Sequence, residues 1–126
     1  MKKILIDTSV WISYFKNKSA HKILDEYILN NQICTNNLIL SELIPFLQIK
    51  KERKVIDLLL EVENVTLRID WEYIIKIQIQ NLKNGINKVG IPDLIIIDNV
   101  INNNLILFSE DKHFKLMQEY LKFELI

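Results

Sequence analysis

A short apolar run that ends in an aspartate most constrains what this chain can fold into. The run lies in Lys2–Trp11 (KKILIDTSVW), where Ile4, Leu5 and Ile6 stand together without polar alternation. Such a run is typical of a strand buried on both faces inside a parallel sheet. Open α/β sheets place their chemistry at the carboxyl ends of these strands. Asp7 is therefore a candidate site residue, and capping of the following helix is the alternative interpretation.

Size and composition favour one domain over residues 1–126. The chain is 49% hydrophobic, which is ample for a core, and its two glycines and two prolines leave no room for a flexible linker. Sixteen basic and sixteen acidic side chains cancel, so net charge neither indicates nor excludes nucleic-acid binding. Cys34 is the only cysteine, and no apolar run approaches the length of a bilayer span. We therefore expect a cytoplasmic protein without membrane association.

Strand-like and helix-like periodicities alternate along the chain. We predict strands over residues 4–6, 32–35, 65–69 and 105–108, with a possible edge strand over 122–126. Helices are expected over 9–15, from Ser19 to about residue 29, from residue 37 onward, and over 50–61, 71–83, 91–104 and 111–120. Pro45 predicts a kink or an early stop in the third helix. The alternation predicts a largely parallel sheet with helices on both faces.

Three further acids stand out against this framework. Glu42 lies in an apolar segment, NNLILSEL, where a buried carboxylate would need a partner or a metal ion, while an exposed position is the alternative. Asp93 opens the helix of GIPDLIIID, and Asp111 follows the strand of LILFSEDKHF. Capping is the alternative for both aspartates. The conjunction of these acids with Asp7 in one α/β chain is more informative than any one of them.

Three ordered segments of the chain resemble the PIN domain family. They are ILIDTSVWI, the SE of NNLILSEL, and IPDLIIIDNVINNNLILFSEDKHFKL, which matches the family's aspartate-opened helix, strand and Thr/Ser–x–Asp–x–x–Phe turn. Size and shape are similar to those of VapC-type ribonuclease toxins, although about residues 48–88 match by helical pattern only. The resemblance implies an α/β fold, a PIN-like three-layer sandwich with a central, mostly parallel four- or five-stranded sheet flanked by helices.

The same resemblance implies a metal-dependent endoribonuclease. Carried over position by position, the acidic catalytic and metal-binding site would be Asp7, Glu42, Asp93 and Asp111. Ser109 would support it by holding a metal ion, its water or Asp7. Carboxylate and water are the ligands that Mg²⁺ and Mn²⁺ prefer. One or two such ions would activate a water and stabilise charge on the phosphate.

The residues next to this site have less defined roles. We predict that Lys112 and Lys115 contact RNA phosphates. The family often has a further acid where His113 stands, and we interpret this histidine as a surface or substrate-facing side chain rather than a ligand. Asp98 follows Asp93 by five residues and so does not share its helical face; we interpret it as a solvated or supporting acid.

Partners also follow from the resemblance. It implies an RNA substrate, a cognate antitoxin protein and a homodimer, with aromatic and aliphatic positions near residues 11–15 and 43–49 available for these contacts. A non-catalytic PIN-like module that binds RNA or a protein is the alternative function. A phosphotransfer enzyme with Asp7 as nucleophile is a third hypothesis, but DTSVW lacks the second aspartate, two residues on, that haloacid-dehalogenase-like phosphatases carry.

Overall fold

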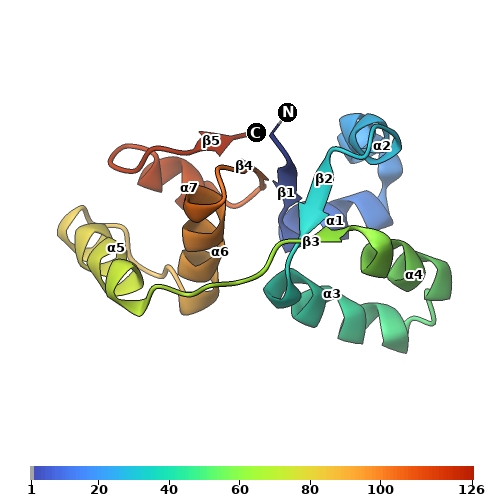
Figure 1. The fold of residues 1–126 in the computed structure, drawn as a ribbon, viewed down its shortest axis with the longest axis horizontal. Helices are drawn as coiled ribbons and strands as arrows, with labels where there is room; N and C mark the ends of the chain where they lie inside the picture. The colour runs from blue at the N-terminus through green and yellow to red at the C-terminus, as the bar shows by residue number, and fades with distance from the viewer. Residues whose placement is uncertain (1) are drawn as a thin grey trace.

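A five-stranded parallel sheet forms the centre of the computed structural model, which describes residues 2–126 (Figure 1). All neighbouring strands pair in parallel, in the order β3-β2-β1-β4-β5. The strands are β1 (Ile4–Ile6), β2 (Ile33–Thr35), β3 (Glu63–Asn64), β4 (Ile106–Phe108) and β5 (Glu124–Leu125). This architecture confirms the predicted α/β class and the parallel sheet.

Helices flank the sheet and divide between two sides of the molecule in Figure 1. The helices are α1 (Thr8–Lys16), α2 (Lys22–Leu29), α3 (Asn37–Ile49), α4 (Arg53–Glu61), α5 (Trp71–Lys83), α6 (Ile91–Asn102) and α7 (Lys112–Met117), with a 3₁₀ turn at Lys18–His21. Helices α1–α4 lie on one side with β1–β3, and α5–α7 lie on the other with β4 and β5 (Figure 1). An extended segment, residues 65–70, connects the two sides.

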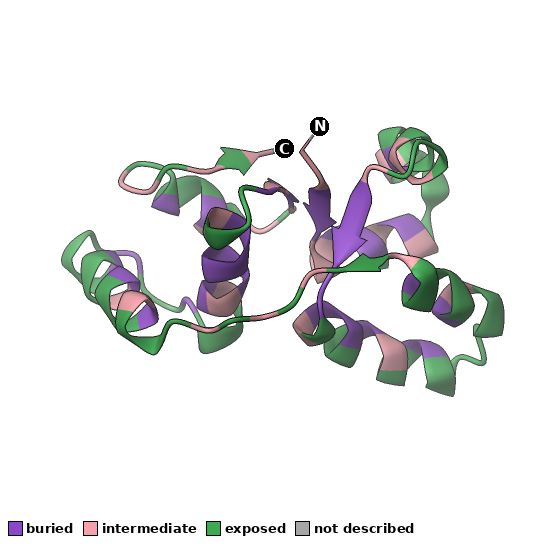
Figure 2. Ribbon diagram, viewed as in Figure 1, coloured by how far each residue is buried: buried purple, intermediate pink, exposed green. Residues whose placement is uncertain are grey.

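The core is built around the central strand β1. All three of its residues are buried, and burial continues on the inner faces of α1 and α6, as the purple segments of Figure 2 show. Cys34 packs in β2, where burial raises the pKa of its thiol to about 12, so it serves as a core residue. Within residues 2–126, no helix is long and apolar enough to cross a membrane.

The register of β1 fixes which side chains meet beyond the sheet. Ile6 pairs with Phe108 of β4, and the next backbone N–H, that of Asp7, donates to the Phe108 carbonyl at 2.9 Å. Both strands run in the same direction, so the residues that follow them leave the sheet at one edge. Asp7 and Ser109 are therefore neighbours although 102 positions separate them.

Two predicted elements are wrong in the middle of the chain. The strand predicted over 65–69 is absent: β3 ends at Asn64, and Val65 adds one hydrogen bond, to the Thr35 carbonyl, before the chain leaves the sheet for α5. The helix predicted from residue 50 begins at Arg53, because Lys51 adopts a positive φ of 59° that ends α3 and turns the chain.

Two helix-boundary predictions also need correction. Helix α3 does not stop at Pro45 but continues to Ile49. Pro45 and Ser41 are both exposed, so water can hydrate the Ser41 carbonyl that loses its helical N–H donor. Helix α2 begins at Lys22 rather than after Ser19, because Asn17 caps a separate 3₁₀ turn by accepting from the Ser19 backbone N–H.

Candidate functional site

Asp7 stands at the junction of β1 and α1, at the carboxyl edge of the sheet. Its carboxylate accepts no backbone N–H from the first turn of α1 within the described residues, so the capping interpretation does not describe this side chain. Instead, Asp7 Oδ2 accepts hydrogen bonds from the hydroxyls of Ser9, at 2.8 Å, and Ser109, at 2.7 Å. Two hydroxyls on one oxygen hold the carboxylate in a fixed orientation and leave Oδ1 for another partner.

Ser109 links the two ends of the chain that form the site. Its hydroxyl donates to Asp7 and accepts the backbone N–H of Asp111 at 3.0 Å. Asp111 then caps α7, because its Oδ1 accepts the backbone N–H of His113 at 2.9 Å. For Asp111, capping and a place in the site therefore occur together, since the second carboxylate oxygen takes no part in the cap.

Glu42 reaches the same region from α3. Of the two positions that the sequence left open, the exposed one is found: Glu42 lies with Ser41 on the polar side of its helix. Its Oε1 accepts a hydrogen bond from the Thr8 hydroxyl at 2.9 Å, which ties it to the residue next to Asp7. An exposed carboxylate held in this way faces solvent and remains available to a ligand.

Asp93 lies in the first turn of α6, on the other side of the site. Burial is the largest cause that raises the pKa of its carboxyl to about 6. Three carboxylates raise it further through charge repulsion, while His113 acts in the opposite direction; these carboxylates are Asp111, Asp7 and Glu42. Asp93 therefore lies within electrostatic reach of the other three predicted acids. The four acids come from four different segments of the chain.

The raised pKa of Asp93 predicts a pH-dependent gain from Asp93→Asn in metal-free protein. The folded state favours the neutral carboxyl, so ionisation removes stability as pH rises from about 4 to above 6. A shift of about two units corresponds to at most ~3 kcal/mol. Solvent screening lowers this gain in the free energy of unfolding because Asp93 is only partly buried. The gain is lowered further because a neutral asparagine loses the attraction between a carboxylate and the helix dipole. We expect the variant to be about 1 kcal/mol more stable at pH 7.5, or about 3 °C in Tm.

Thermal unfolding in EDTA at pH 3.5 and pH 7.5 checks this expectation. At pH 3.5 the Asp93 carboxyl is largely protonated in both the folded and the unfolded wild-type protein. The wild type and Asp93→Asn should therefore have nearly the same Tm. Asp57→Asn, which alters an exposed aspartate of α4, serves as the control and should show no such pH-dependent gain. An equal gain at both pH values would contradict the electrostatic cause.

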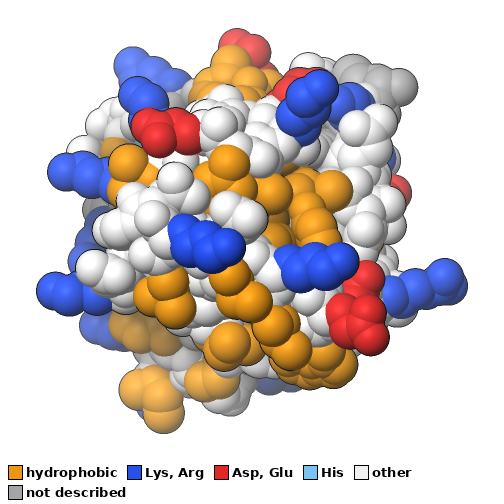
Figure 3. Space-filling view, turned by 90° about the vertical axis from the view of Figure 1, so that its left-hand side faces the viewer, with side chains coloured by type: hydrophobic (Ala, Val, Ile, Leu, Met, Phe, Trp, Pro, Cys, Tyr) orange, Lys and Arg blue, Asp and Glu red, His pale blue; other side chains and the backbone are white. Residues whose placement is uncertain are grey.

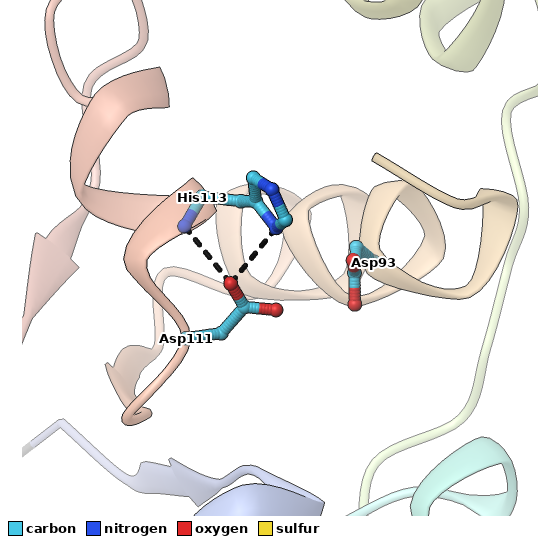
Figure 4. A group of neighbouring side chains, drawn as sticks. All are labelled: Asp93, Asp111 and His113. Atoms are coloured by element: carbon cyan, nitrogen blue, oxygen red, sulfur yellow. Dashed lines mark hydrogen bonds and ion pairs between the residues drawn. The ribbon is translucent and has the colours of Figure 1, made fainter. Parts of the chain in front are cut away.

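His113 groups with two of the acids. Oxygens of Asp93 and Asp111 and a ring nitrogen of His113 all lie within 4.8 Å of one another. In Figure 4, Asp93 projects from α6 while Asp111 and His113 come from the start of α7. His113 Nδ1 lies 2.9 Å from Asp111 Oδ1, and within residues 2–126 this shielded nitrogen has no hydrogen-bond partner.

Of the remaining predicted residues, two lysines are exposed near the site and one aspartate is buried away from it. Lys112 and Lys115 are exposed on α7, close in sequence to Asp111. Asp98 does not join the acids: it is 2% exposed, accepts the backbone N–H of Asp70 at 3.1 Å and accepts an amide N–H of Asn102 at 2.7 Å. The interpretation of Asp98 as solvated is wrong, and its contacts instead anchor the start of α5 to α6.

Two hydroxyls that belong to the site were not selected from the sequence. Ser9 positions Asp7 and also accepts the Glu110 backbone N–H at 3.1 Å, and Thr8 positions Glu42. Both follow the aspartate at the end of a buried strand, so the same carboxyl-edge argument that selected Asp7 applies to them.

The donor set suits a hard divalent cation. Carboxylate oxygens dominate it, as Mg²⁺ and Mn²⁺ require. Nδ1 of His113, which is shielded from solvent and lies 2.9 Å from Asp111 Oδ1, is a further donor beside these carboxylates. Together these observations fit a metal ion, which would also neutralise the clustered negative charge.

The fold and site define a class of α/β domains that gather acidic side chains at the carboxyl edge of a parallel sheet. The family model of the PIN domain matches residues 4–120, so the chain belongs to the PIN domain family. This family is in general one of nucleases that use divalent metal. No curated protein sequence gives a significant match to this chain.

Solved structures with the same fold are VapBC complexes. DNA-bound VapBC from Salmonella typhimurium aligns with a TM-score of 0.78 and 20% identity, over 100% of this chain and 98% of that chain. VapBC2 from Rickettsia felis, bound to a promoter DNA fragment, gives 0.74 and 21%, and VapBC-1 from nontypeable Haemophilus influenzae gives 0.73 and 21%. Both alignments cover 98% of this chain and 96% of the other. The chain therefore has a VapC-type PIN fold.

Proposed function

We propose that this chain is a metal-dependent endoribonuclease that cleaves RNA phosphodiester bonds and is the toxin of a type II toxin–antitoxin pair. The observation that carries the proposal is the acidic cluster at the carboxyl edge of the sheet: ligand atoms of Asp93, Asp111 and His113 lie within 4.8 Å of one another, and Ser109 joins Asp111 to Asp7 through hydrogen bonds. Clustered carboxylates repel one another and an RNA backbone, so such a cluster is useful once a cation is bound. Membership of a nuclease family supports the same function.

The residues of the site then divide into metal ligands, residues that orient these ligands, and residues that contact the RNA backbone. Asp7, Glu42, Asp93 and Asp111 would hold Mg²⁺ or Mn²⁺. The bound ion supplies an activated water and charge stabilisation at the phosphate. Ser9 and Ser109 orient Asp7, and Thr8 orients Glu42. Lys112 and Lys115 offer positive charge for the RNA backbone beside the acids. An RNA substrate in the cell makes the cytoplasm the expected place of action.

Cleavage of total bacterial RNA by the purified protein tests this function. We expect discrete fragments with Mg²⁺ or Mn²⁺ and intact RNA with EDTA. The preparation must be shown to be folded, by circular dichroism, and free of antitoxin, by mass spectrometry. No cleavage with either metal would contradict the nuclease and favour the non-catalytic module that binds RNA or protein.

A groove between α1, α3 and α4 suits an antitoxin segment. It measures about 420 Å³, and its apolar lining includes Ile12, Phe15 and Phe46. Lysines 16, 18 and 50 also line it, so an extended peptide with apolar and acidic side chains would match its chemistry. These residues fall in or next to the ranges 11–15 and 43–49 that the sequence predicted for partner contacts.

A homodimer is the second expected assembly, and α5 offers a surface for it. Four apolar side chains of α5 do not face the core: Trp71, Ile75, Ile79 and Leu82 are 56, 59, 46 and 62% exposed. They lie four, four and three positions apart and so form one stripe along α5. Figure 3 shows this side of the molecule, where apolar side chains gather beside lysines.

The α5 stripe is complementary to itself when two copies run antiparallel. That arrangement places Trp71 against Leu82 of the second copy and Ile75 against its Ile79. It also brings Glu72, in the first turn of α5, toward Lys83 in the last turn of the other helix. The two helix dipoles then oppose each other, which is favourable. A second copy therefore fits this stripe in both apolar pattern and charge.

Ile79→Lys tests the α5 dimer, because it places a charge at the centre of the stripe. We expect a wild-type dimer and at least a tenfold weaker association in the variant, equal to about 1.4 kcal/mol or more. Light scattering after size-exclusion chromatography measures the mass of each protein. Leu60→Lys changes an apolar residue of α4 that is 61% exposed and should remain dimeric. A monomeric wild type, or a dimeric Ile79→Lys, would contradict this interface.

A further inference from the structure

His113 occupies a position that suits a metal ligand better than a surface side chain. It stands two residues after Asp111, in the first turn of α7. Its backbone N–H donates to Asp111 Oδ1, and its Nδ1 lies 2.9 Å from the same oxygen (Figure 4). The nitrogen is shielded from solvent, although the ring itself is only half-buried, and its polar contact within the described residues 2–126 is this pairing with Asp111. The contact requires a proton on the imidazole or on the carboxyl, and a cation bound between the two groups would take the place of that proton.

The spacing of the three groups matches one coordination sphere. Neighbouring ligands on an octahedral ion with bonds of about 2.1 Å lie roughly 3 Å apart, and opposite ligands roughly 4.2 Å. His113 Nδ1 and Asp111 Oδ1 are 2.9 Å apart, and the Asp93 oxygen completes a set within 4.8 Å. Small side-chain rotations would therefore bring all three onto a single cation.

The nitrogen donor changes which ion the site prefers. Mg²⁺ takes oxygen ligands and water almost exclusively, whereas imidazole is a ligand for first-row transition metals. Mn²⁺ accepts carboxylate oxygen readily and belongs to the transition series. We propose that His113 coordinates the metal ion together with Asp93 and Asp111, and that it gives this site a preference for Mn²⁺ over Mg²⁺. The inference rests on the metal site of the proposed function, and it concerns one ligand and the choice of ion.

Electron spin echo spectroscopy of bound Mn²⁺ tests this ligand without any RNA or cleavage assay. Modulation from a coordinated imidazole ¹⁴N is expected in the wild-type protein and should vanish in His113→Gln. The chain has one other histidine, His21, which pairs with Glu110, so His21→Gln is the matched control and should retain the modulation. Modulation that persists in His113→Gln, or bound Mn²⁺ without nitrogen modulation in the wild type, would overturn the proposal.

Metal affinities provide the second measurement. By calorimetry, His113→Gln should weaken Mn²⁺ binding about tenfold or more and change Mg²⁺ binding far less. His113→Asp replaces nitrogen by oxygen and should shift the ratio of the two affinities toward Mg²⁺. An unchanged Mn²⁺ affinity in His113→Gln would overturn the assignment. If the folded wild type binds neither ion, or if Asp93→Asn binds both as well as the wild type does, the metal site itself fails and the proposed function with it.

Discussion

Asp7→Asn is expected to remove metal-dependent RNA cleavage, with a loss of about 10³-fold or more in rate. Asparagine keeps the size of the side chain and one oxygen for the hydroxyls of Ser9 and Ser109, so the edge of the sheet keeps its arrangement. It removes the negative charge that would hold the cation. The effect should therefore fall on chemistry and metal binding, while the fold stays intact or gains stability from weaker repulsion with Asp93.

Initial rates on one defined RNA fragment from the total-RNA digest measure this loss. Asp57→Asn on α4 removes an exposed aspartate from outside the site and should cleave at the wild-type rate. Thermal unfolding of all three proteins separates inactivity from misfolding. A folded Asp7→Asn that cleaves at the full metal-dependent rate would remove Asp7 from the mechanism.

Trp11→Ala should have the largest effect on stability, a loss of about 3–5 kcal/mol. Trp11 is 0% exposed, stacks on Phe15 with ring centroids 5.5 Å apart, and meets Tyr14 edge-on at 6.1 Å. Truncation leaves a cavity beneath α1, the helix that follows Asp7. Burial also assigns Trp11 to the core and excludes it from stacking on an RNA base. Urea unfolding followed by circular dichroism measures the change in the free energy of unfolding.

Trp11→Phe is the informative comparison. The indole Nε1 makes no hydrogen bond with any residue among 2–126, so the loss of its N–H costs nothing in polar contacts. We expect Trp11→Phe to lose less than half as much stability as Trp11→Ala. Equal losses would show that ring shape rather than volume governs this part of the core.

The parallel sheet was predictable because its central strands have a clear sequence pattern. The runs at Ile4–Ile6 and Leu105–Phe108 have no polar alternation, and a parallel sheet requires their carboxyl ends to meet. That rule alone brings the neighbourhoods of Asp7 and Asp111 together. The edge strand was harder, because Val65–Ile69 alternates like a strand but only Val65 finds a backbone partner. Pairing at an edge depends on where the chain goes next, and local pattern does not contain that information.

Helix α5 shows why a buried face was not predictable. It carries two apolar sets, and the structure buries Ile74 and Ile77 while it exposes the four-residue stripe. Asn81 is fully buried on the inner face, where it hydrogen-bonds to Tyr120 and to Gln78. A polar residue at that position gives the inner face a less apolar pattern than the exposed stripe. Tyr120 is far away in sequence, so periodicity gives no sign that the amide is satisfied.

The order in which the site residues occur along the chain has a consequence for synthesis. Asp7 and Glu42 lie in the first third of the sequence, and Asp111 follows β4, the strand that pairs with β1. A ribosome making this protein therefore exposes no complete set of carboxylates until Asp111 has emerged. Because β1 pairs with a strand about a hundred positions later, this edge of the sheet depends on a long-range contact, which costs loop-closure entropy and slows folding. Under the proposed function, the metal site is therefore incomplete for as long as only residues 1–110 have been made.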